Sequence, residues 1–388
     1  MKKSIVFFIT LAFGIQLFSV VPFYYGARSL SLGYSSSAFN YDINAIFINP
    51  ALLSALNVPI TGYQFQNGFF GYRGFYDDLN EVLKYDLKNF EGLDPESQDI
   101  IHEKLKSVYG YKHGMYGFNS NLPGVAFKRY GFSVSFVNTS IINPLETDIL
   151  DKFSQNLTNN DIKNLEFNII GLKYTQYSLA YGLDFSQSFS IGVAIHYLNG
   201  KVSEYNRSIT SDIFSTGSRE KEYIEYGWAG AEKKFGKVVT DFSLSAVVGK
   251  FFRLGIIMKN FSDPKIQTEL GEIVLNQRII AAIAFKPDNK TGIFLDIDIK
   301  KGDLLHNGND MQPISIGLEK SFFNNKFFLR AGFMSDLTEQ YFIGKKGNVL
   351  YAFGMGFNMG NFMVDAGLGL GNDGKVRNLA ISGFFIMK

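Results

Sequence analysis

Apolar residues recur at every second position along much of this chain. In residues 361–370, which read NFMVDAGLGL, the apolar Phe362, Val364 and Leu368 alternate with Asp365 and two glycines. A period of two predicts a β-strand with two different faces. In a soluble protein the apolar face turns to the core, whereas in a transmembrane barrel it turns to lipid.

The same alternation recurs in about fourteen segments of about ten residues. Clear examples are residues 132–136, 177–183, 191–197, 242–248, 292–300, 326–334 and 349–357. Strands of soluble sheets usually span about five or six residues, whereas a tilted strand needs about nine to eleven to cross a bilayer. The lengths therefore favour strands that cross a membrane.

The face opposite the apolar one carries Gly, Ala, Ser, Asp or Arg. Such a face suits a polar barrel interior better than the packed second layer of a sandwich. Because only a closed barrel pairs every backbone group of strands in lipid, the sequence predicts an all-β fold. We expect a transmembrane antiparallel β-barrel of about 14 strands, with its apolar faces pointing outward.

Two kinds of connection separate these segments. Short turn signals lie at residues 287–289, 323–325 and 358–360. The long polar connections, which we expect to be extracellular loops, are residues 77–109, 144–163 and 206–226. In the first of them Asp94 is placed to cap a helix that has Pro95 in its first turn. A second short helix is expected in the next long connection.

The N-terminus has the order of charged and apolar residues found in secretory signal peptides. Lys2 and Lys3 precede a largely apolar run over residues 5–21. We predict a signal peptide over residues 1–25, and a retained membrane anchor of about 17 residues is the alternative. Beyond residue 25 no stretch approaches about 18 consecutive apolar residues, so the rest of the chain would enter a membrane only through strands.

Composition agrees with a membrane barrel. The chain has 39 Phe, 21 Tyr and 39 Gly, and only 19% of its residues are charged, against about 25% in average proteins. The net charge is +2 and like charges form no block, so nucleic-acid binding is not expected. Cysteine is absent, and no cofactor or metal site is predicted because the histidines lack metal-binding spacing. They are His102, His113, His196 and His306.

Residues 26–56 do not alternate, which separates them from the barrel predicted over residues 57–388. Asn49 is placed to cap a short helix in which Pro50 occupies the first position and Ala51 the next. A helix of about two turns is unstable by itself. This segment therefore needs a larger structure to hold it.

The N-terminal segment also carries a family resemblance. The order Gly26-Ala27-Arg28, Leu32-Gly33, Asp42 and Asn49-Pro50-Ala51 resembles the mature N-terminus of the FadL-type outer-membrane barrel superfamily. That superfamily includes fatty-acid and hydrocarbon transporters, PorV-type secretion accessories and TraF-like barrels. The resemblance implies a barrel in the bacterial cell outer membrane whose N-terminal segment folds back into the lumen as a plug. The serines 35–37 and Phe39 depart from the pattern, which is usually richer there in Gly and Ala.

The resemblance and the alternation together predict two sets of site residues. The predicted plug and gating residues are Gly26, Arg28, Asp42, Asn49, Pro50 and Ala51. The predicted lumen-lining residues are His196, Asp296, Asp298, Lys300, Arg330 and Asp365. We expect a channel or transporter for hydrophobic small molecules such as fatty acids, surrounded by membrane lipid. The alternative is a non-transporting barrel, a structural or protein-secretion accessory that binds an envelope protein partner through its long loops.

Three motifs have chemical interpretations that compete with simpler ones. Residues 369–374 match G-x-G-x-x-G, but a strand pattern follows instead of the helix of a dinucleotide loop. Asp296 and Asp298 share a strand face with Lys300, which predicts a charge network in a polar lumen and not a metal site. His196 lies near serines, as in a membrane-embedded hydrolase. The sequence assembles no triad, however, so no enzyme activity is predicted.

Overall fold

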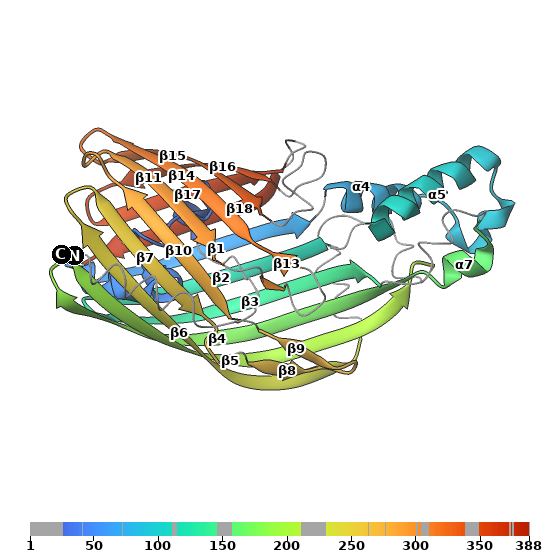
Figure 1. Ribbon diagram of the computed structural model, residues 1–388, viewed down its shortest axis with the longest axis horizontal. Helices are drawn as coiled ribbons and strands as arrows, with labels where there is room; N and C mark the ends of the chain where they lie inside the picture. The colour runs from blue at the N-terminus through green and yellow to red at the C-terminus, as the bar shows by residue number, and fades with distance from the viewer. Residues whose placement is uncertain are drawn as a thin grey trace.

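The computed structural model of this chain is a closed barrel of antiparallel strands (Figure 1). It describes residues 26–387 apart from 41, 72, 111–114, 146–156, 211–229, 263, 276, 300–301, 304–309, 338–348, 372–373 and 375. Strands adjacent in the barrel follow one another along the chain, and β1 (Ile60–Gly71) pairs with β18 (Val376–Ile386) to close it. With 14 strands in the ring, the predicted all-β barrel is confirmed. The predicted signal peptide lies outside the described residues.

The other barrel strands are β2 (Met115–Phe127), β3 (Tyr130–Pro144), β4 (Glu166–Ser186), β5 (Phe189–Ser208), β6 (Glu232–Val248), β7 (Phe252–Lys259), β10 (Arg278–Phe285), β11 (Thr291–Asp298), β14 (Pro313–Phe322), β15 (Phe327–Asp336), β16 (Leu350–Asn358) and β17 (Phe362–Leu370). Two small sheets in the connections consist of β8 (Lys265–Gln267), β9 (Glu272–Val274), β12 (Gly302–Asp303) and β13 (Asp310–Met311). The helices are α2 (Gly26–Ser31), α3 (Ala45–Ile48), η1 (Pro50–Ala55), α4 (Arg73–Val82), η2 (Leu87–Gly92), α5 (Pro95–Gly110) and α7 (Asn159–Lys163).

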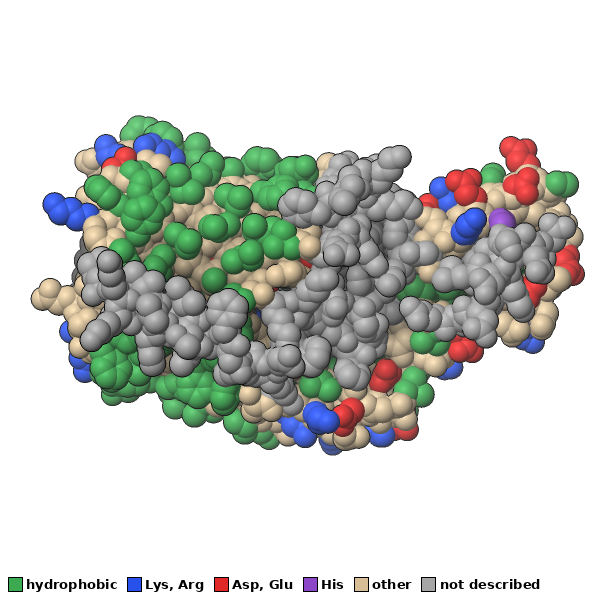
Figure 2. Space-filling model, viewed as in Figure 1, with side chains coloured by type: hydrophobic (Ala, Val, Ile, Leu, Met, Phe, Trp, Pro, Cys, Tyr) green, Lys and Arg blue, Asp and Glu red, His purple; other side chains and the backbone are tan. Residues whose placement is uncertain are grey.

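The apolar face of the alternating strands points outward, as predicted. Along β17 Phe362 is exposed, while Asp365, three residues further on and on the opposite face, is fully buried. Leu318 on β14 and Phe353 on β16 are 52% and 49% exposed, although both are large and apolar. Hydrophobic side chains consequently cover the barrel wall (Figure 2). A soluble protein would turn these side chains to its core, so the exposed apolar surface calls for a nonpolar surrounding.

Short turns and long connections lie at opposite ends of the barrel. The predicted turns at residues 287–289, 323–325 and 358–360 each join two neighbouring strands. The prediction that each strand has about ten residues is wrong for β4 and β5, which have 21 and 20. The halves of these strands nearer the long connections continue under the helices, where Phe167 and Tyr205 pack into a separate apolar cluster.

Helices α4, α5, η2 and α7 form an extension beyond the long-connection end of the barrel (Figure 1). Helix α5 begins at Pro95, and Asp94 caps it as predicted, because its carboxylate accepts hydrogen bonds from the backbone N and the Oγ of Ser97. These bonds hold the pKa of the Asp94 carboxyl below its usual value. Among the described residues, no helix is both long enough and apolar enough to cross a membrane.

Candidate functional site

Residues 26–56 lie inside the barrel. Helix α2 packs against β16, β17 and β18, and η1 packs against β4 and β5 on the other side of the interior. All described residues from Gly26 to Ser54 are buried except Phe39, which is half-buried. The barrel thus supplies the larger structure that the short helices of this segment need (Figure 1).

A buried ion network joins this segment to the wall. Arg28 donates from Nε and Nη2 to the Glu319 carboxylate, at 3.1 and 3.3 Å. Glu319 also accepts from Arg330 Nε at 2.7 Å, and Arg330 Nη1 donates to Asp365 at 2.6 Å. Two cations and two anions alternate along this chain of contacts, so their charges balance. Balance matters because a buried ion without a partner is strongly destabilising.

Arg28 also contacts Phe39, the residue that departs from the family pattern. Its guanidinium donates to the Phe39 carbonyl at 3.0 Å and lies 5.9 Å from the centre of the Phe39 ring. Two wall cations share the ring, because Arg253 and Lys286 lie 4.8 and 4.2 Å from its centre. An aromatic face attracts cations, so Phe39 helps to keep three positive charges near one another.

The two strand carboxylates have different partners. Asp296 accepts from the backbone N of Ser37 at 2.9 Å, which links it to the N-terminal segment. Asp298 forms a two-point ion pair with Arg278, at 2.5 and 2.8 Å. The described cation beside Asp298 is Arg278. Lys300, the predicted neutralising neighbour of the two carboxylates, lies outside the described residues.

The Asn49-Pro50-Ala51 turn is held by the side chain that the sequence singled out. Asn49 Oδ1 accepts from the backbone N of Ala51 at 3.1 Å, which caps η1, and Asn49 Nδ2 donates to the Ser37 carbonyl at 2.8 Å. The same Ala51 N–H donates to Ser243 of the wall at 2.9 Å. Asn49 therefore shapes the turn and ties it to the preceding loop.

The start of the segment and Asp42 are held by shorter-range contacts. Gly26 has a positive φ of 72° and donates from its backbone N to Gln66 of the wall at 3.3 Å. Asp42 is fully buried and accepts from the backbone N of Asn44 at 2.6 Å. Asp42 thus stabilises the turn before α3 within the segment itself.

Glycines of the wall allow the segment's backbone to lie directly against the strands. A Cβ added to Gly192 would fall 2.1 Å from the Ala51 backbone N, and one added to Gly332 would fall 2.1 Å from the Gly33 backbone N. Both distances are far below van der Waals contact. Further wall glycines that face the segment in this way are Gly182, Gly317, Gly354 and Gly367. The segment fits closely against the wall because these wall positions are glycines, which have no side chain.

His196 lies in the wall within a polar ladder across β4, β5 and β6. Its Nδ1 lies 2.8 Å from Ser178 Oγ, and its Nε2 lies 3.1 Å from Asp241 Oδ2. These are the three residue types of a hydrolase triad. Asp241 is also paired with Lys259 at 2.7 Å, and Phe47 of the N-terminal segment stacks on the imidazole, with ring centres 6.1 Å apart. Because all three groups are buried and the ring is covered, the ladder is better explained as a means of holding the segment.

Sequence reasoning missed several partners in the interior. They are Ser178, Asp241, Ser243, Lys259, Arg278 and Glu319. The alternation does place each of them on an inward face. Their pairing depends on the register between strands, which the sequence pattern does not supply.

An apolar cavity of about 710 Å³ lies on the outer face of the barrel wall. Its lining is mostly outward-facing and apolar, and includes Phe185, Phe242 and Met258. It also includes Gly192 and Ser243, the two wall residues in contact with Ala51. The cavity thus lies on the outer face of the same strands whose inner face contacts the Asn49-Pro50-Ala51 turn.

Comparison with known proteins identifies the fold. No protein-family model matches the chain, and no curated protein matches it by sequence. Among solved structures, a FadL homologue from Pseudomonas aeruginosa matches with 10% identity and a TM-score of 0.54, covering 95% of this chain and 99% of that one. The toluene transporter TodX from Pseudomonas putida matches with 13% identity and a TM-score of 0.52, covering 94% and 98%. At these identities the matches establish a shared fold.

Proposed function

Given a barrel with the FadL-type fold, we propose that this chain is a channel for hydrophobic small molecules in a bacterial outer membrane. The observation that carries the proposal is a closed barrel with an apolar outer surface and an interior filled by residues 26–56. Residues 26–56 act as its plug. The similar structures include a toluene transporter and a FadL homologue, and this supports the same class of ligand.

The outer membrane provides the nonpolar surrounding that the barrel wall requires. Exposed apolar side chains cover the strands, and backbone groups are paired around the closed ring. The short turns would face the periplasm and the long connections the cell exterior, as in other outer-membrane barrels.

The plug is held by apolar packing against the wall and by buried polar contacts. A rearrangement can exchange the polar contacts for contacts with water. An apolar ligand entering from the long-connection side would leave the lumen after the plug has shifted. Fatty acids and small aromatic hydrocarbons are the ligand classes we propose. The chemistry requires no catalytic group, so we propose a non-enzymatic role for the His196 ladder as well.

Uptake by intact cells tests the transport role. Apolar solutes cross a phospholipid bilayer unaided, so the assay needs the polar surface layer of a living outer membrane. Cells that lack their own hydrophobic channels should take up radiolabelled oleate or toluene faster, and saturably, when they produce this chain. Uptake equal to that of cells with an empty vector, despite a folded barrel in the outer membrane, would contradict transport.

Substitution of Gly192 by Ala should loosen the plug. The added methyl would collide with the backbone of Ala51, and overpacking of this kind costs about 1–3 kcal/mol. We expect more frequent channel openings in planar bilayers than for the unmodified protein. Gly383→Ala is the matched control, because its Cβ would face outward at an ordinary 3.7 Å from the Phe362 ring. Equal opening frequencies in the two variants would argue against a plug seated on Gly192.

One observation favours a second role, that of an accessory barrel. The helical extension has its own apolar cluster, which includes Leu79, Val82, Ile101 and Leu105, and it stands beyond the barrel (Figure 1). A preformed extension of this kind could hold an envelope protein. A stoichiometric partner retained in mild detergent, and lost when residues 84–106 are replaced by a short linker, would support this role.

A further inference from the structure

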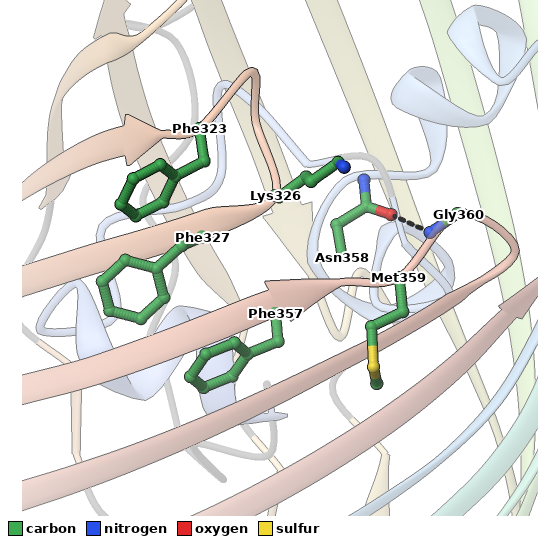
Figure 3. Close-up of a pocket in the computed structure, with 7 residues that line it drawn as sticks. All are labelled: Phe323, Lys326, Phe327, Phe357, Asn358, Met359 and Gly360. Carbon is green, nitrogen blue, oxygen red and sulfur yellow. Dashed lines mark hydrogen bonds between the residues drawn. The ribbon is translucent and has the colours of Figure 1, made fainter.

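A groove of about 800 Å³ lies on the barrel edge at the turns β14–β15 and β16–β17. Figure 3 shows Phe323, Phe327, Phe357 and Met359 along one side of it. The Phe327 and Phe357 rings lie with their centres 5.0 Å apart. Phe323 is 77% exposed and Met359 65% exposed, so the groove presents apolar surface at the tips of two turns.

The backbone holds Phe323 in this exposed place. Phe323, Asn324 and Asn325 have consecutive positive φ values of 51°, 56° and 62°. Asn adopts this left-handed conformation readily, whereas a bulky aromatic residue does so rarely. The turn therefore directs a large apolar ring away from the barrel at a cost in backbone energy, which indicates that the ring meets an apolar surrounding.

The other side of the groove carries hydrogen-bond donors. Lys326 is exposed, and Figure 3 shows its ammonium on the same side as the Asn358 amide nitrogen. Asn358 Oδ1 accepts from the backbone N of Gly360 at 3.1 Å, which fixes the orientation of the amide. Within the described part of the chain no carboxylate pairs with Lys326. The groove thus combines an apolar side with an ammonium and an oriented amide.

The charge of this end of the barrel is complementary to an anion. The residues between strands in the six short turns include the basic residues Lys128, Arg129, Lys250, Lys290 and Lys326, besides Lys286, which lies against Phe39. The only acidic residue in these six turns is Asp288, and its carboxylate already accepts hydrogen bonds from the backbone N of Lys290 and Thr291. Blue side chains are visible beside the apolar wall at this end in Figure 2.

We propose that the groove binds one anionic phospholipid of the membrane leaflet on the short-turn side. The phosphate lies against Lys326 and the Asn358 amide, and the acyl chains run along Phe327 and Phe357. Charge-assisted hydrogen bonds favour the phosphate, and the aromatic rings supply the amphipathic contact typical of a membrane interface. The inference rests on the outer-membrane setting of the proposed function, and it is independent of what the channel transports.

Native mass spectrometry of the full-length mature barrel tests the proposal. The protein is purified in mild detergent with equal amounts of phosphatidylglycerol and phosphatidylethanolamine, and the lipids that remain bound are counted. We expect the unmodified barrel to retain phosphatidylglycerol preferentially. Lys326→Gln should reduce that preference about fivefold, the factor that corresponds to about 1 kcal/mol for one lysine near a membrane surface.

Two further variants separate headgroup from acyl-chain contacts. Lys234→Gln, an exposed lysine in the half of β6 nearer the long connections, should leave the preference unchanged. Phe323→Ser should lower retention of both lipids without changing their ratio. Inorganic phosphate at millimolar concentration should not displace the lipid, and displacement would overturn a phospholipid as the occupant.

Equal retention of both lipids by the unmodified barrel, or an unchanged preference in Lys326→Gln, would overturn the proposal. Failure of the proposed function would be seen in the uptake assay and not here. If the barrel prefers phosphatidylglycerol but cells that produce it take up neither oleate nor toluene, the lipid site is supported and the transport role is contradicted.

Discussion

Deletion of residues 26–56 is expected to convert a mostly closed barrel into an open pore. These residues fill the interior and pack against opposite sides of it, α2 on β16–β18 and η1 on β4 and β5. Barrels of about eight strands are filled by side chains, whereas those with about 16 strands leave an aqueous channel. This barrel has 14 strands, close to the larger class, so removal of residues 26–56 should leave a continuous water-filled path.

Single-channel recording in planar bilayers measures this effect. We expect the unmodified barrel to stay near the baseline of the bare bilayer and the deletion variant to show discrete, long-lived conductance steps. Electrophoresis of unheated samples serves as the control for folding. Both proteins should show the shifted mobility of a closed barrel. Unchanged conductance from a folded deletion variant would contradict the assignment of these residues as the plug.

Substitution of Arg330 by Met should produce the largest loss of stability among single changes in the interior. Arg330 is fully buried and bonds to both Glu319 and Asp365. Its removal leaves Asp365 without the cation that compensates it, and breaking a buried ion pair costs about 3–5 kcal/mol. The free energy of unfolding, measured by urea titration in lipid vesicles, should fall by about that amount.

Two companion variants test the cause. Lys173→Met removes an exposed cation from β4 and should change the free energy of unfolding by less than about 0.5 kcal/mol. Combining Arg330→Met with Asp365→Asn should recover part of the loss, because the uncompensated carboxylate is then gone. If the double variant is no more stable than Arg330→Met, lost packing and not unpaired charge explains the effect.

Much of the barrel follows from sequence alone, because a strand has only two faces. The alternation around Phe362 and Asp365 states which side each residue occupies, and the structure agrees. Asn49 and Pro50 likewise mark a helix start through local backbone chemistry, and η1 begins at Pro50. Such features depend on neighbours within a few residues, so they can be read directly from the order of residues.

The interior partners could not be predicted in the same way. Glu319 meets Arg28 only because α2 lies beside that part of the wall, and Asp298 meets Arg278 only because β10 and β11 have a particular register. Strand length also escaped prediction for β4, because the apolar cluster under the helices stabilises it beyond the height of a bilayer. These features depend on contacts between distant segments.

The pairing of β1 with β18 determines the order in which the molecule can be assembled. Ile60 lies opposite Ile386, so the seam joins segments from the two ends of the barrel sequence. A ribosome produces residues 26–56 before any barrel strand, and β18 after the other thirteen. Residues 26–56 are therefore synthesised before the barrel that encloses them, and they can reach their buried position only as β1 and β18 pair.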